Sequence, residues 1–285
     1  MNRVIQNRAA TAAGYAQRLQ RVADHIWDHL DEPMDLAALA AIACFSPHHF
    51  HRIYRNTVGE TVAETLVRLR LQRAARQLAW SDQPIAGIAR QAGYGSSAAF
   101  SRAFRASYGR PPSAFRDGEP ACATQAAAGP ALVMKVEIQD RGPMRLASVP
   151  HHGPPQTVGR AFDKLMAWAG PRGFTLPPQV GVALWLSDMM TTPLEDQRAI
   201  AGLTVGPEVQ GDDTVAIYDV PGGRHAVVLY KGPFVHIARG YDVLFSWLPA
   251  SGEEPADRPL FEVNLNDPRR TAPDDLLTEI CLPLK

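Results

Sequence analysis

The spacing of hydrophobic residues changes along the chain, and the change falls near residue 117. Before it, apolar residues recur every three or four positions, which is typical of amphipathic helices. The first such series is Tyr15, Leu19, Val22, Ile26 and Leu30. After it, short runs rich in β-branched residues alternate with single helical patterns, as expected for strands and helices in one domain. The strand-like runs cover residues 134–138, 146–149, 215–218 and 225–230. The pattern predicts an all-α part followed by an α+β part.

Residues 117–130 separate these parts. They are small or turn-forming and include no large apolar side chain, so they cannot bury a face against a core. We therefore expect one domain over residues 1–116, a linker over 117–130 and a second domain over 131–285.

Charge divides the chain at the same place. Residues 1–116 contain 15 Arg, no Lys and 8 acidic residues, a formal charge of +7, whereas the remainder has 14 basic and 21 acidic residues, a formal charge of −7. A basic domain attracts a polyanion, and guanidinium groups match the geometry of phosphate and of guanine edges. The first domain therefore has the charge of a DNA-binding module.

The first domain contains an internal repeat. Leu36, Leu39 and Ala40 match Ile85, Ile88 and Ala89 at an offset of 49 residues, and Ser46, Phe50, Arg52, Arg55 and Gly59 match Ser96, Phe100, Arg102, Arg105 and Gly109 at 50. Each copy reads as a short helix, a turn, and a second helix capped by serine, which is the spacing of a helix-turn-helix. A connecting helix over residues 62–79 would span about 27 Å, enough to set two second helices near successive major grooves.

The second helix of each unit is the expected recognition helix. Phe50 and Phe100 begin its apolar face, and the opposite face is left for DNA. The expected DNA-binding residues are His48, His51, Arg52, Arg55, Ser97, Ala98, Ser101, Arg102 and Arg105. The histidines of the first helix have no acidic or cysteine partner nearby, so no metal site is expected.

The first domain closely resembles the AraC/XylS family of transcription regulators. The resemblance spans about residues 15–116 and is carried by the segments 85–89, 93–105 and 109–116. It implies a DNA-binding module with two recognition helices. Cys44 departs from the family, because it occupies a turn where glycine is usual, as at Gly93; a positive φ at Cys44 would store strain.

The second domain is also duplicated. A gapless offset of 79 superposes residues 136–168 on 215–247 with 12 identities in 33 positions. Each copy reads as strand, turn, strand, and a helix that starts after Gly-Pro. We expect two such units to pack about a pseudo-twofold axis with a cleft between them.

This half resembles the GyrI-like effector-binding domain, an α+β fold built from a duplicated strand-helix-strand-strand unit. The carrying features are the two Gly-Pro helix starts, Leu186-Ser187-Asp188, Thr192-Pro193, and the terminal segments 261–268 and 278–284. The resemblance implies that Glu262 faces a cleft that accepts hydrophobic, often cationic, molecules. The expected ligand-binding residues are Glu262, Trp185, Tyr230, Phe234 and Tyr241. Asn264 departs from the family, which commonly has Tyr there.

Three other interpretations of the second domain stay open. Glu262 could pair with an internal arginine, since a buried carboxylate needs a cation, a donor or a proton. It could act as the general base of a small-molecule hydrolase, although no hydrolase motif accompanies it. The domain could instead bind another protein. The preferred interpretation is a sensor with no catalytic residue, no metal and no cofactor.

The whole sequence therefore predicts a DNA-binding transcription regulator whose activity is modulated by a small ligand. It has no long apolar run and three widely separated cysteines, so we expect a cytoplasmic protein without a membrane partner. The expected partners are an operator in double-stranded DNA and a small-molecule effector, with RNA polymerase as a further candidate.

Overall fold

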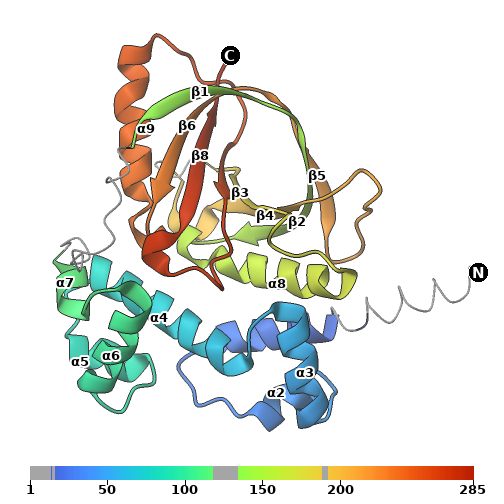
Figure 1. Ribbon diagram of the computed structural model, residues 1–285, viewed down its shortest axis with the longest axis vertical. Coiled ribbons are helices and arrows are strands. Elements are labelled where there is room, and N and C mark those ends of the chain that lie inside the picture. Colours follow the sequence, from blue (N-terminus) through green and yellow to red (C-terminus); the bar gives the residue numbers. More distant parts are fainter. Residues whose placement is uncertain (1–13, 15–16, 118–133, 188–191) are drawn as a thin grey trace, which may run out of the picture.

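The computed structural model describes residues 14, 17–117, 134–187 and 192–285, which form a helical lobe and a sheet lobe (Figure 1). The helical lobe contains a helix over residues 17–28, α2 (Leu36–Ile42), α3 (Pro47–Val58), α4 (Val62–Trp80), α5 (Ile85–Gln91), α6 (Ser97–Tyr108) and α7 (Pro112–Arg116). No strand occurs among the described residues before 134. The predicted linker lies outside the described residues apart from Asp117.

The capping residues explain where the main helices begin. The side chains of Ser46 and Ser96 accept hydrogen bonds from the backbone at the starts of α3 and α6. Thr61 and Glu64 form a reciprocal capping box at the start of α4. Asp35 stands at the corresponding position before α2, but its side chain makes no capping bond.

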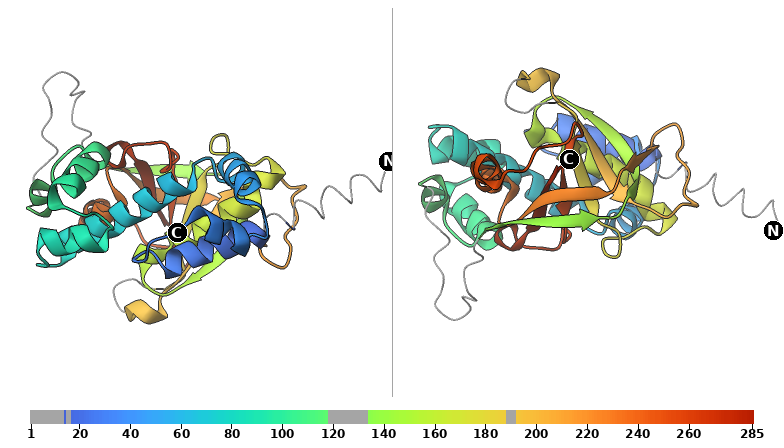
Figure 2. Two further views of the ribbon diagram at one scale, coloured as in Figure 1. Left: turned by 90° about the horizontal axis from the view of Figure 1, so that it is seen from below. Right: turned by 90° about the horizontal axis from the view of Figure 1, so that it is seen from above.

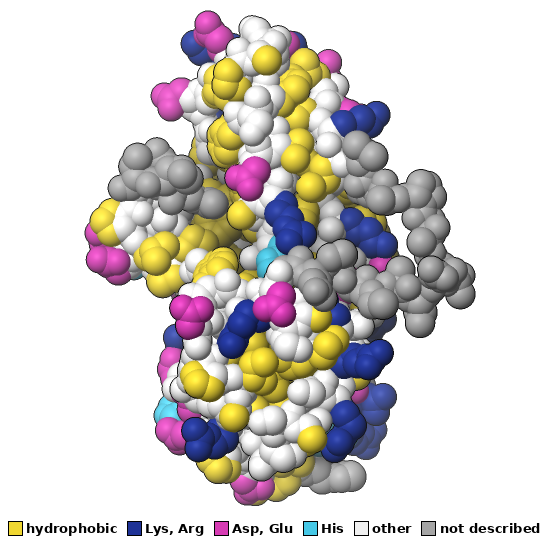
Figure 3. Space-filling view, turned by 90° about the vertical axis from the view of Figure 1, so that its left-hand side faces the viewer, with side chains coloured by type: hydrophobic (Ala, Val, Ile, Leu, Met, Phe, Trp, Pro, Cys, Tyr) yellow, Lys and Arg dark blue, Asp and Glu magenta, His cyan; other side chains and the backbone are white. Residues whose placement is uncertain are grey.

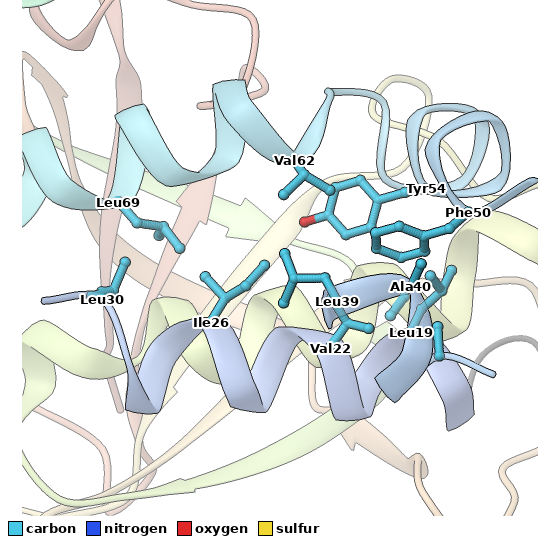
Figure 4. Close-up of a cluster of buried hydrophobic side chains, with 12 residues drawn as sticks. Leu19, Val22, Ile26, Leu30, Leu39, Ala40, Phe50, Tyr54, Val62 and Leu69 are labelled. Carbon is cyan, nitrogen blue, oxygen red and sulfur yellow. The ribbon is translucent and has the colours of Figure 1, made fainter. Parts of the chain in front are cut away.

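Each helix-turn-helix has its own apolar core. The first core gathers side chains from the helix over 17–28, α2, α3 and the first half of α4, and Phe50 and Leu69 lie within it (Figure 4). The second core gathers the end of α4 with α5, α6 and α7 around Phe100, Phe104 and Phe115, which are fully buried. Helix α4 therefore belongs to both units and sets their spacing; its 19 residues span about 28 Å.

The sheet lobe is built from one eight-stranded antiparallel sheet. The strands are β1 (Val136–Arg141), β2 (Met144–His152), β3 (Gly181–Trp185), β4 (Arg198–Thr204), β5 (Ala216–Val220), β6 (Gly223–Lys231), β7 (Leu260–Asn264) and β8 (Leu277–Pro283). Their order across the sheet is β1-β6-β8-β7-β3-β4-β2-β5. Exchanging each strand for its counterpart in the other repeat reverses this order, so the sheet has a pseudo-twofold axis between β3 and β7.

The duplicated unit has the predicted strand-helix-strand-strand core, preceded by an edge strand. The helices are α8 (Gly159–Ala169) and α9 (Ala238–Ser251), and each follows a short 3-10 turn, η1 (Pro155–Thr157) or η4 (Phe234–His236), so the helix itself starts later than the sequence pattern predicted. The edge strands are exchanged: β1 pairs with β6 and β5 pairs with β2. Exchange of edge strands ties the repeats into one domain.

The two helices cover one face of the sheet, one helix over each repeat (Figure 2). The opposite face is buried by strand residues alone, including Leu146, Val182 and Phe261, because the sheet curls around them (Figure 1). The predicted fold class, an all-α double helix-turn-helix followed by a duplicated α+β domain, is confirmed.

Candidate functional site

The outer faces of α3 and α6 carry the residues expected to contact DNA. On α3, His51, Arg52 and Arg55 are exposed, while Phe50 and Tyr54 on the other side are buried. The side chain of His48 lies outside what the structure describes. The structure therefore gives this helix the amphipathic orientation that the sequence predicted.

Helix α6 has the same division. Ser97, Ala98, Arg102 and Arg105 are exposed and Ser101 is half-buried. Helix α3 also contacts α8 of the sheet lobe, whereas the residues named above on both helices are exposed or half-buried. The polar face of each is therefore open for a duplex, and none of its described arginines is used in an ion pair.

The turn before each recognition helix has a left-handed residue. Gly93 has a φ of 81° and Cys44 a φ of 54°, and Cys44 is the one non-glycine residue with positive φ in the described part of the chain. A side chain at positive φ meets the backbone, so Cys44 stores strain that glycine would avoid. The two turns nevertheless have the same handedness.

A cavity of about 1670 Å³ lies between the helix-covered face of the sheet and the helical lobe. Its walls come from α8, α9, β3, β7 and the loop after β7 on one side, and from α4 and the end of α6 on the other. It is larger than the 300–1,000 Å³ of most small-molecule sites, so an effector could occupy only part of it.

Glu262 lies at the centre of the sheet and lines this cavity. It is 6% exposed, and one carboxylate oxygen, Oε1, accepts a hydrogen bond of 3.0 Å from Trp185 Nε1 and a second from the Tyr241 hydroxyl. Among the described residues, none donates to Oε2 and no Lys or Arg forms an ion pair with the carboxylate. Burial raises the pKa of Glu262 to about 6, although the two hydrogen bonds favour the ionised form.

Three of the four expected aromatic residues lie at the cavity. Trp185 and Tyr241 contact Glu262 directly, and Phe234 lines the wall from η4. Burial and the neighbouring carboxylate raise the pKa of the Tyr241 hydroxyl well above its ordinary value, so this group stays a donor at neutral pH. These three residues and Glu262 form the candidate ligand site.

The structure corrects the expectation for Tyr230. Its side chain does not line the cavity but packs in the core between α9 and strands β6 and β8. Its hydroxyl donates a hydrogen bond of 2.9 Å to Pro233 O, in the connection between β6 and η4. An apolar ring with a satisfied hydroxyl and 3% exposure has a structural role here.

Sequence reasoning missed two groups of cavity residues. One group consists of Phe162, Ala183 and Asn264, which the offset of 79 relates to Tyr241, Glu262 and Trp185. Each is the repeat counterpart of a residue expected in the site, so the repeat contained the signal that could have found it. The other group comes from α4, including Val67 and Trp80. No local pattern marks these two residues, because only docking of the lobes brings α4 to the cavity.

The helical lobe contacts each repeat of the sheet lobe at a separate place. Ala167 of α8 is part of the first helix-turn-helix core, and Val235 of η4 packs against the second core. The rings of Phe115 and His236 lie 4.9 Å apart at the second contact. Each repeat of the sheet lobe thus holds one helix-turn-helix unit.

A buried polar network joins the lobes beside the cavity. Arg68 of α4 forms ion pairs with Glu60 at 2.6 Å and with Asp163 of α8 at 3.6 Å, and Trp27 Nε1 donates to Asp163 at 2.7 Å. Burial would lower the pKa of Arg68, but the two carboxylates raise it on balance. Burial also raises the pKa of Asp163 in spite of Arg68. The charges of Arg68 and Asp163 therefore stabilise each other against the cost of burial.

Arg160 and Lys164 make a second, more exposed set of contacts from α8. Arg160 pairs with Asp24 and Asp28 of the first helix at 3.1 and 2.8 Å, and Lys164 pairs with Asp24 at 3.0 Å. Neither basic residue lines the cavity. These pairs fix α8 to the first helix-turn-helix without forming part of the candidate ligand site.

The architecture defines a DNA-binding protein with an attached small-molecule domain, and comparison with known proteins agrees. The model of a GyrI-like small molecule binding domain matches residues 134–285, and that of a helix-turn-helix domain matches residues 39–118. The regulatory protein SoxS of Salmonella typhimurium is 32% identical over 102 residues, which are 36% of this chain and 95% of SoxS.

Two further similarities concern one regulator and one solved structure. The transcriptional regulator YbfP of Bacillus subtilis is 35% identical over 102 residues, so this chain matches 35% of the length of YbfP and 36% of its own. The crystal structure of the EcmrR C-terminal domain has 15% identity and a TM-score of 0.46, and the match covers 54% of this chain and 99% of that one.

The chain belongs to the GyrI-like family and carries the AraC-type DNA-binding domain of transcription regulators at its amino-terminal side. Both resemblances found in the sequence are therefore confirmed. No helix in the described part of the chain is long and apolar enough to cross a membrane.

Proposed function

We propose that this protein is a transcription regulator whose operator binding responds to a hydrophobic cation held at Glu262. The observation that carries the proposal is the state of that carboxylate. It is buried in the wall of a large cavity, yet among the described residues it has hydrogen-bond donors and no cationic partner. The alternative in which an internal arginine neutralises it has no support in these contacts.

A cation with apolar substituents would satisfy this site. Its charge would stabilise the ionised form of Glu262, which burial disfavours. The ring faces of Trp185, Phe234 and Tyr241 can add cation–π attraction of roughly 0.5–2 kcal/mol each where they approach the charge. The site thus offers both a counter-charge and apolar walls.

On the DNA side, we propose that the exposed faces of α3 and α6 enter two major grooves. Arg52 and Arg102 stand at matching positions of the two helices, and each can make a bidentate contact with guanine. Arg55 and Arg105 lie one helical turn further on, where phosphate contacts would position the helices. His51, Ser97, Ala98 and Ser101 complete the proposed surface, and His48 remains part of the expectation from sequence.

The two contacts between the lobes provide a route from ligand to DNA. Ala167 and Val235 fix one helix-turn-helix unit to each repeat, and the cavity lies between those repeats. A ligand that favours one separation of α8 and α9 would favour one separation of the recognition helices. Such coupling requires different ligand affinity in the two states.

The test is thermal unfolding of the full chain with tetraphenylphosphonium and with tetraphenylborate, which has nearly the same shape and the opposite charge. We expect a saturable stabilisation by the cation, since selective binding to the folded state stabilises it, and a much weaker effect of the anion. Glu262→Gln should remove this preference. It keeps an oxygen that can accept from Trp185 and Tyr241, so the fold is preserved.

Equal stabilisation by both ions, or a cation effect that Glu262→Gln leaves unchanged, would refute the cation site. Operator binding is measured separately on DNA selected from a random pool. If the wild-type chain selects no sequence under these conditions, the proposal that it reads an operator fails regardless of the ligand result.

A further inference from the structure

Exposed apolar side chains are concentrated at the cavity between the lobes. In the described part of the chain, seven large hydrophobic residues are exposed, and five of them line this one cavity. They are Val67, Trp80, Leu186, Leu194 and Phe245. Single exposed apolar residues are normal on a protein surface, whereas a cluster in a concave site indicates a ligand or partner.

Two of the five belong to the DNA-binding domain. Val67 and Trp80 lie on α4 with exposed fractions of 48% and 58%. Ala63, four residues before Val67, and Arg76, four residues before Trp80, also line the cavity, so one face of α4 is turned toward it. Neither Val67 nor Trp80 belongs to the core of a helix-turn-helix unit.

The apolar face of α4 is turned to the cavity and lies outside both recognition helices. This face of α4 lines the cavity, which Phe245, Leu260 and Glu262 of the sheet lobe also line. Figure 3 shows hydrophobic side chains in the recess where the two lobes meet. The apolar stripe of α4 is therefore presented to whatever occupies the cavity.

We infer that the effector site is composite: Glu262 of the sheet lobe binds the charged group of an elongated amphipathic cation, and Val67 and Trp80 of α4 bind its apolar tail. The inference rests on the proposed cation site and adds a preference for cations with a long apolar tail. The volume of about 1670 Å³ leaves room for a tail beyond the aromatic walls around Glu262. A bound tail would contact the helix that spaces the two recognition helices.

The experiment compares butyltrimethylammonium with decyltrimethylammonium, below its micellar concentration, by calorimetric titration of the full chain. Each buried methylene contributes to affinity, so the longer ion should bind at least about tenfold more tightly. The double variant Val67→Ser/Trp80→Ala should lose most of this gain while binding the shorter ion as the wild type does. Both side chains are exposed, so the fold should tolerate their replacement.

Ile138→Ser is the matched control, because Ile138 is 47% exposed but does not line the cavity. Its gain from the longer tail should equal that of the wild type. Glu262→Gln should weaken both ions together. Together, a reduced gain in the double variant, an unchanged gain in Ile138→Ser and weaker binding of both ions by Glu262→Gln would support both the cation site and the composite site.

Two outcomes would overturn the inference, and they differ from each other. If the double variant retains the full gain while Glu262→Gln still weakens both ions, the composite site is wrong and the cation site stands. If neither ion binds the wild type, or Glu262→Gln changes nothing, the cation site fails and the inference fails with it.

Discussion

Ala183 pairs with Glu262 across the centre of the sheet, and the two residues are equivalent positions of the duplicated unit. Their separation of 79 residues is the offset that relates the two repeats. The pseudo-twofold axis therefore passes beside a carboxylate on one strand and a methyl group on the other. Trp185 and Asn264 are related in the same way, as are Phe162 and Tyr241. The duplication thus supplies paired positions beside the axis, and their divergence places a carboxylate on one side of it and a methyl group on the other.

The buried carboxylate makes stability depend on pH. The pKa of Glu262 is about 6 in the folded chain against 4.5 for an ordinary glutamate, so the folded state favours the protonated form. The contribution of Glu262 to the free energy of unfolding is therefore fully present below about pH 4.5, and it is lost as the pH rises through 6. Glu262→Gln, which stays neutral, should exceed the wild type in unfolding free energy by about 2 kcal/mol at pH 8 and by little at pH 4.

Urea unfolding at both pH values measures this difference. Glu195→Gln serves as the control, since Glu195 is exposed and should give the same small difference at each pH. A difference between Glu262→Gln and the wild type that does not change with pH would contradict the shifted pKa.

Arg102 should determine sequence preference at one half-site. It is exposed on α6, where a guanidinium can reach guanine, so Arg102→Ala should weaken binding to a selected operator by about 1–3 kcal/mol and relax specificity there. Gel-shift titration on the operator and on single-base variants tests both effects. The control is Arg198→Ala, because Arg198 is an exposed arginine on β4 of the sheet lobe. An equal loss of operator affinity in both variants would show that Arg102 does not contact bases.

The ion pairs of Arg160 and Lys164 should contribute to coupling rather than to ligand affinity. They join α8 to Asp24 and Asp28 and do not line the cavity. In the double variant Arg160→Ala/Lys164→Ala, tetraphenylphosphonium should bind as in the wild type but should change operator affinity less. In the wild type, the effect of the cation on operator affinity should decrease as the salt concentration rises, because salt screens these ion pairs.

Operator titrations with and without the cation give this coupling directly. Arg145→Ala, which breaks a partly exposed ion pair with Asp219 within the sheet lobe, should leave it unchanged. Undiminished coupling in the double variant would show that the other contacts between the lobes suffice.

Cys44→Gly should stabilise the first helix-turn-helix. Cys44 has a φ of 54°, where a side chain is strained and glycine is not, so we expect a gain of up to about 1 kcal/mol in unfolding free energy. Ala41→Gly, three residues earlier and exposed on α2, should instead lose about 1 kcal/mol, because glycine is a poor helix former. Thermal unfolding of both variants measures the two signs; a loss in Cys44→Gly would show that the turn is not strained.

Local sequence determined the elements and their capping. Ser46 and Ser96 start the recognition helices where the sequence placed them, because a capping side chain acts within three residues of itself. The periodicity of Phe50 and Phe100 likewise gave the buried faces of those helices. The offset of 79 predicted the paired repeats, since similar sequences fold into similar units.

Tertiary structure alone decided which of these residues meet. The sequence does not distinguish Tyr230 from Tyr241 as a ligand-binding residue. In the structure, Tyr230 is buried against α9, whereas Tyr241 donates a hydrogen bond to Glu262. Asp163 and Asp242 are equivalent in the repeat, but only Asp163 meets Arg68, since α4 lies against one repeat at that position. Contacts between segments far apart in sequence depend on how the lobes dock, and no local pattern contains that information.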